Sequence, residues 1–220
     1  MAEMHPVFAG LADINDTRAF GESGDRECFD DLGRLFDQHQ KCNLYEVNLL
    51  HTHYVVREGE AVVNRFNPAK RMLVGEIRPT EEAQKTLPWS LRLFGDTFIP
   101  NQWLAVTTSV AKYDFSHDRQ FLAEVGSVLA DHNALNRFGV QLRLPFLDPS
   151  PGKILMEYID EEKRTSTLVF VDEEERNAPS IIDTSWIFSR AAASFEADQA
   201  CHWYNHARCR RICHHGSGGE

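Results

Sequence analysis

The chain has 220 residues, of which 42% are hydrophobic and 25% are charged, a composition typical of a soluble globular protein with one or two domains. Its formal net charge of −10 argues against a nucleic-acid-binding protein, because such surfaces need clustered Lys and Arg. The sequence contains no run of 18 apolar residues and no signal-peptide pattern, so we expect no membrane span and no membrane partner. Five cysteines, three of them in the last 20 residues, are a poor disulfide framework and favour a cytoplasmic location.

The first half of the chain predicts a helix followed by three strands. Apolar residues recur at helical spacing before residue 41, and a long β-like run with many β-branched and aromatic residues comes next. Gly59 and the polar stretch from Asn67 to Lys70 mark turns. The expected elements are a helix at 25–41 and strands at 44–57, 60–66 and 71–77.

The second half repeats this order after a segment that we expect to be largely irregular. Residues 78–101 carry Pro79, Pro88 and Pro100, which disfavour regular structure. The β-like run at 102–113 then precedes a second helical pattern. The expected elements are strands at 102–113, 138–147, 153–159 and 164–171, and a helix at 117–135.

The two halves also align with each other without gaps at an offset of 93 residues, residues 33–71 onto 126–164. Identical pairs include Gly33/Gly126, His39/His132, Val47/Val140, Leu49/Leu142, Gly59/Gly152 and Arg71/Arg164.

Together these patterns predict an α+β fold, with antiparallel sheets covered by helices and a pseudo-duplicated βαβββ-like module. We expect one globular domain at 1–190, built from modules at about 25–77 and 103–171. Residues 191–220 would form a C-terminal helix and a Cys/His-rich tail, because this segment begins Ala-rich and contains no proline.

A histidine pair, His51-Thr52-His53, is the main candidate for chemistry. Side chains alternate along a strand, so the two imidazoles would share one face. At the 93-residue offset they match Leu144 and Phe146, part of an apolar stripe, which predicts that the pair faces the interior. Neutral imidazole is the commonest metal ligand, and the set suits a divalent ion of iron, zinc or copper.

The neighbours of this pair follow from a hairpin hypothesis. If Glu58-Gly59 is a two-residue turn, Asn64 lies directly opposite His53, and Glu60 shares the same face. We therefore assign Glu60 and Asn64 as candidate catalytic residues and Glu58 as a further candidate ligand.

Two other histidines, His39 and His132, occupy equivalent places near the predicted helix ends. An imidazole there can bond the last carbonyl groups and interact favourably with the helix dipole. We interpret both as structural.

The C-terminal tail offers a second group of metal-ligand types. On a helix, His202, His206, Cys209 and Cys213 would lie on one stripe. One straight helix cannot supply four tetrahedral ligands, so at most two or three of them would bind, completed by another element such as the His51/His53 pair. The alternative is a terminal helix with no metal.

Two partial resemblances involve these features. His51-Thr52-His53 with Glu58 resembles the first half of the cupin metal motif, HxH-x4-E, over eight residues, without the second half. The duplicated βαβββ pattern is similar to the topology of the vicinal-oxygen-chelate fold, whose metal ligands come from strands that line a cavity. Neither resemblance identifies a family.

Two functional hypotheses remain open. The first is a small-molecule metalloenzyme of oxidoreductase or lyase/isomerase type, with a small organic substrate in an interior cavity. The second is a non-catalytic ligand-binding or protein-interaction module with structural histidines. A zinc ion that only fixes the C-terminal tail to the rest of the protein is compatible with both hypotheses.

Overall fold

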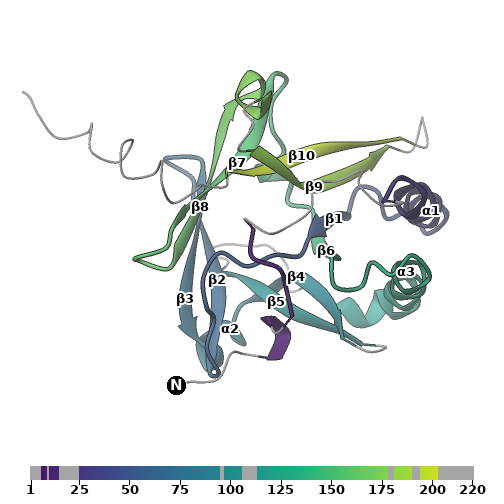
Figure 1. Cartoon of the computed structure of the whole chain (residues 1–220), viewed down its shortest axis with the longest axis horizontal. Coiled ribbons are helices and arrows are strands. Elements are labelled where there is room, and N and C mark those ends of the chain that lie inside the picture. Colours follow the sequence, from purple (N-terminus) through teal and green to yellow (C-terminus); the bar gives the residue numbers. More distant parts are fainter. Residues whose placement is uncertain are drawn as a thin grey trace, which may run out of the picture.

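In the computed structural model, a closed barrel of ten strands forms the body of the molecule (Figure 1). The structure describes residues 6–8, 10–14, 25–94, 97–105, 113–177, 181–189 and 194–202. The strands are β1 (Tyr45–Leu49), β2 (Glu60–Asn67), β3 (Met72–Pro79), β4 (Leu87–Phe94), β5 (Thr97–Ala105), β6 (Phe138–Leu142), β7 (Lys153–Asp160), β8 (Thr165–Asp172), β9 (Ile181–Ser189) and β10 (Ser194–His202). The α-helices are α1 (Asp25–Gln38), α2 (Thr80–Ala83) and α3 (Arg119–Asp131), and the short 3-10 helices are Pro6–Phe8, Phe115–Asp118, Pro145–Leu147 and Glu173–Asn177.

The strands follow one another around the barrel in the order β1, β6, β4, β5, β2, β3, β8, β7, β10, β9. Most neighbours are antiparallel, but β2 pairs with β5 and β7 pairs with β10 in parallel. No helix within the described ranges is both long and apolar enough to cross a membrane.

The predicted α+β sheet with covering helices is therefore wrong, and so is the predicted C-terminal helix. The segment with Pro88 and Pro100 forms β4 and β5, because register shifts on either side of Ser90 make room for proline in the ladder. Residues 194–202 form β10 although the segment is Ala-rich. Pairing with β9 and β7 buries Ala200 and Cys201 completely, and this burial overrides local helix propensity.

Helices α1 and α3 lie side by side at one end of the barrel (Figure 1). Their apolar stripes meet the core, where the Phe36 and Phe121 rings stack edge to face at 5.0 Å. His39 pairs with Glu124 at 2.9 Å, and His132 pairs with Asp31 at 2.7 Å. These two contacts link the helices reciprocally, and they differ from the helix-end carbonyl contacts that the sequence predicts.

Strands from the two halves of the chain are interleaved. In the β1–β6 pair Val47 lies opposite Val140, and in the β3–β8 pair Val74 lies opposite Thr167. Strand β1 lies between β6 and β9, so the first strand of the first half is surrounded by strands of the second. The segments 25–77 and 103–171 thus do not form separate sheets, and the loop that leaves β1 enters the second half of the barrel.

Candidate metal centre

The histidine pair lies in the loop that follows β1. The long strand predicted at 44–57 ends at Leu49, but the backbone of Thr52 is still held in a strand-like way. The Thr52 N–H donates to the Ala12 carbonyl, and the Ile14 N–H donates to the Thr52 carbonyl, both at 2.9 Å. These bonds form a parallel bridge between Asp13 and Thr52. The N-terminal segment thus lies beside Thr52 in the way that a neighbouring strand would.

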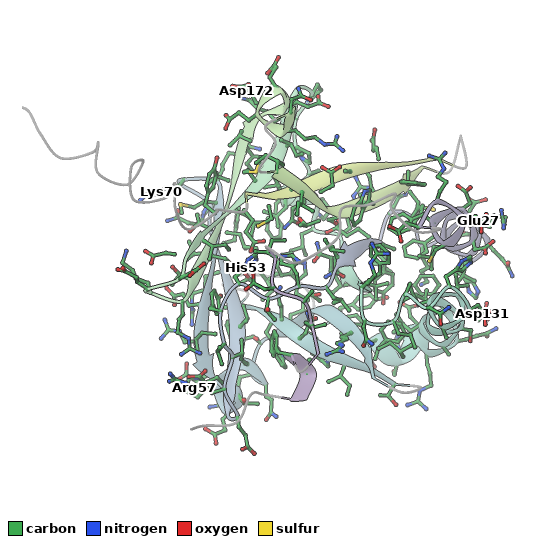
Figure 2. The ribbon with its side chains drawn as sticks, in the orientation of Figure 1. Glu27, His53, Arg57, Lys70, Asp131 and Asp172 are labelled. Carbon is green, nitrogen blue, oxygen red and sulfur yellow. The ribbon has the colours of Figure 1, made fainter. Side chains whose placement is uncertain are left out.

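His51 and His53 lie on one side of this loop, as the sequence predicted. Their ring centroids are 4.5 Å apart, and their Nε2 atoms are 3.0 Å apart. Figure 2 shows His53 near the middle of the molecule, whereas Arg57 lies at its periphery.

Two further ligand types complete the group, Glu157 on β7 and Cys201 on β10. These residues are register partners in the parallel β7–β10 pair. The Glu157 Oε2 atom lies 3.2 Å from Nε2 of His53 and 3.8 Å from Nε2 of His51. One ligand atom from each of His51, His53, Glu157 and Cys201 falls within 4.8 Å of every other, so this group could hold a metal ion.

The hydrogen bonds fix the tautomer of one imidazole. Nδ1 of His51 lies 2.8 Å from the Leu49 carbonyl oxygen, which can only accept, so this nitrogen carries the proton. In the neutral ring Nε2 of His51 therefore presents its lone pair to the other donors. Nδ1 of His53 is buried and has no hydrogen-bond partner among the described residues.

Burial and mutual contacts shift the pKa values of three groups in the cluster. Burial by itself would raise the pKa of Glu157, but the facing histidines outweigh burial and lower this pKa. Burial lowers the pKa of His53, despite the attraction of Glu157. Burial and the neighbouring Glu157 raise the pKa of the Cys201 thiol well above its ordinary value.

The remaining sequence-predicted residues lie elsewhere. Glu58 is exposed in the turn before β2. Both carboxylate oxygens of Glu60 pair with Arg164, and the pKa of Glu60 is lowered mainly by that contact. Asn64 is buried, but it lies opposite Gly75 on β3 and Leu104 on β5, not opposite His53.

The tail candidates divide into two groups. His202 is the last residue of β10, next to Cys201, and its side chain is outside the description. His206, Cys209 and Cys213 lie outside the described residues.

A small cavity adjoins the donor atoms. Its volume is about 20 Å³, and its walls include His51, His53 and Glu157. The other lining residues are Phe8, Thr52, Tyr54, Val56, Val62, Gln102 and Ser166. A single water molecule needs about 10–15 Å³ on this measure, whereas pockets for drug-sized molecules span about 300–1,000 Å³.

Comparison of the chain with protein-family models, curated proteins and solved structures finds no match. The site is therefore characterised by its own geometry and chemistry. What these show is a group of two partly buried imidazoles, one buried carboxylate and one buried thiol that could hold a metal ion.

Proposed function

We propose that the protein binds one Zn²⁺ ion through His51, His53, Glu157 and Cys201. The observation that carries the proposal is the spacing of the three nitrogen and oxygen donors. A tetrahedral zinc site with bonds of about 2.0–2.3 Å has donor–donor edges of about 3.3–3.8 Å. The observed separations of 3.0, 3.2 and 3.8 Å lie close to these edges.

The donor set favours zinc over the other ions that the sequence suggests. Two imidazoles and one carboxylate also suit non-haem iron, and imidazole with thiolate also suits copper. A set of two nitrogens, one oxygen and one sulfur in a compact tetrahedral arrangement is most typical of zinc. Binding would release the Cys201 proton, since the thiolate is the metal ligand.

A second hypothesis is that the same contacts are a metal-free hydrogen-bonded network. The 3.0 and 3.2 Å separations are also hydrogen-bond lengths, and one shared proton could bridge the imidazoles and the carboxylate. The two hypotheses differ in metal content alone.

Elemental analysis of the purified full-length protein, after equilibration with Zn²⁺ and desalting, separates them. We expect one tightly bound zinc per chain, lost in His51→Ala/His53→Ala and in Glu157→Gln. A matched control is His39→Gln/His132→Gln, which removes two histidines whose partners are Glu124 and Asp31. Equal zinc content in the site variants and the wild type would refute the proposal.

The role of Cys201 has its own test in the cobalt-substituted protein. A thiolate ligand gives a charge-transfer band in the near ultraviolet, which we expect to disappear in Cys201→Ser. Cys42→Ser serves as the control, because Cys42 is also a buried cysteine outside any disulfide but is not part of the group. A band that survives in Cys201→Ser would remove Cys201 from the ligand set.

A further inference from the structure

Gln102 lines the cavity beside the proposed metal centre, and the nitrogen of its amide group has no hydrogen-bond partner among the described residues. The orientation of this amide follows from Asn64. The Asn64 Nδ2 atom donates to the Trp103 carbonyl at 3.3 Å, and a carbonyl oxygen can only accept. The same Nδ2 donates to Oε1 of Gln102 at 3.0 Å. These two bonds identify which end of each amide is nitrogen.

The Nε2 group of Gln102 is therefore the free end of this chain of hydrogen bonds. Its oxygen is occupied by Asn64, and its two N–H bonds have no partner among the described residues. Gln102 lines the same cavity as His51, His53 and Glu157. An amide donor thus lines the cavity that adjoins the metal-ligand atoms.

The size and lining of the cavity limit what can enter it. Phe8, Val56 and Val62 form apolar walls, and Phe8 and Val62 are 5% and 6% exposed. A volume of about 20 Å³ holds one water molecule or a diatomic ligand. The small organic substrate expected from the sequence would not fit in this space.

We propose that the metal centre, with its four protein ligands, expands to five-coordination and takes an exogenous ligand of one or two non-hydrogen atoms from this cavity, with Gln102 Nε2 as its hydrogen-bond donor. The proposal rests on the proposed zinc site and names the class of its ligand. An N–H donor selects a ligand with a lone pair, such as water, hydroxide or a diatomic anion. Asn64 is then a positioning residue, because it acts only through the orientation of Gln102.

The test uses the full-length cobalt-substituted protein, whose visible spectrum responds to a change in the ligands. Cyanide, with two non-hydrogen atoms, should change the spectrum saturably, whereas thiocyanate, with three, should not at equal concentration. Elemental analysis at each end point shows that cobalt is still bound.

Two variants test the roles of donor and volume. Gln102→Leu should weaken cyanide binding about tenfold, the effect of one lost hydrogen bond to a charged group, with one cobalt per chain retained. Gln84→Leu, a change of the same type at an exposed position, should have no effect. Val62→Ala enlarges the cavity and should admit thiocyanate.

Several results would overturn the inference. A cobalt spectrum that does not change with cyanide would show that the metal takes no added ligand. Equal binding of cyanide and thiocyanate would show that the cavity does not select ligands by size. Unchanged cyanide affinity in Gln102→Leu would remove the donor. Failure of the wild type to bind cobalt would instead overturn the metal centre itself, and this inference with it.

Discussion

Zinc binding should raise the thermal stability of the protein by an amount that the site variants abolish. The four proposed ligands come from the loop after β1 and from β7 and β10, so the ion would join three segments distant in the sequence. An ion that binds only the folded state contributes about 2.7 kcal/mol to the free energy of unfolding at a hundredfold excess over its Kd. For a chain of this size, about 2–4 °C of Tm corresponds to each kcal/mol, which gives a rise of about 5–11 °C.

Differential scanning calorimetry with and without Zn²⁺ measures this shift. His51→Ala/His53→Ala should show no zinc-dependent rise, while His39→Gln/His132→Gln should show the full rise. The shift should shrink as the pH falls, because protons compete with the metal for the imidazoles and the thiolate, and the raised pKa of Cys201 makes its proton harder to displace. An equal zinc-dependent rise in the His51/His53 variant would refute the reasoning, since the stabilisation would then come from another site.

Three further predictions concern the framework of the site. Asp118→Asn should destabilise the fold by about 3–5 kcal/mol in denaturant unfolding, because Asp118 is a buried acceptor for Tyr45 and pairs with Lys41. The hydrogen bonds from Lys41, Tyr113 and Tyr45 lower the pKa of Asp118 against the effect of burial. Its contribution to stability is therefore present above about pH 4, the unfolded-state value, and is lost as the pH falls through the lower folded value. A stability difference between wild type and variant that does not diminish as the pH falls below this range would contradict the reasoning. Gly139→Ala should cost about 1–3 kcal/mol, because the new Cβ would lie 2.4 Å from the Leu91 carbonyl oxygen. Gly126→Ala should cost less, because its Cβ meets only side-chain atoms, those of Leu93 and Phe98. Equal losses in urea unfolding would refute the distinction. Deletion of residues 1–14 should weaken zinc binding at least tenfold in competition titrations. The reason is that backbone hydrogen bonds with Ala12 and Ile14 hold Thr52, which lies between the two ligand histidines. An unchanged Kd for zinc would show that the loop keeps its shape without these bonds.

Local patterns in the sequence predicted most individual elements well. The apolar 3.6-residue spacing placed the first helix at 25–41, and α1 spans Asp25–Gln38. Strands β2, β3, β7 and β8 were placed within about two residues, because glycines with positive φ, Gly59 and Gly152, precede β2 and β7 and polar turns separate the members of each pair. These features depend only on residues close in the chain.

The closure of the barrel could not be predicted in this way, because it depends on pairing between distant strands. The parallel contacts of β2 with β5 and of β7 with β10 leave no local signature in the sequence. Strands β4 and β10 were missed entirely for the same reason: proline in one and alanine in the other disfavour strands locally, and only burial against neighbouring strands reverses that preference.

The candidate site shows the same division between local and distant information. The His51/His53 pair is a local pattern and was found. Glu157 was missed because the hairpin hypothesis placed Asn64 opposite His53. Glu157 stands 93 positions after Asn64, the offset at which the two halves of the sequence align. Strand β1 pairs with β6, and the histidines of the loop after it meet Glu157 on β7 of the second half instead of Asn64 on β2.

The sequence alignment at this offset predicts one metal ion per chain and not two. The positions that correspond to His51, His53 and Glu157 are Leu144, Phe146 and Asn64. Leu144 is buried in the main core, Phe146 stacks on Phe66 at 4.6 Å, and Asn64 bonds to Gln102 and Trp103. These side chains offer no imidazole or carboxylate. A second bound ion in the full-length protein would therefore have to come from outside these positions. The tail is the first place to look, and a chain that ends after His202 keeps Cys201 and would distinguish the two sources.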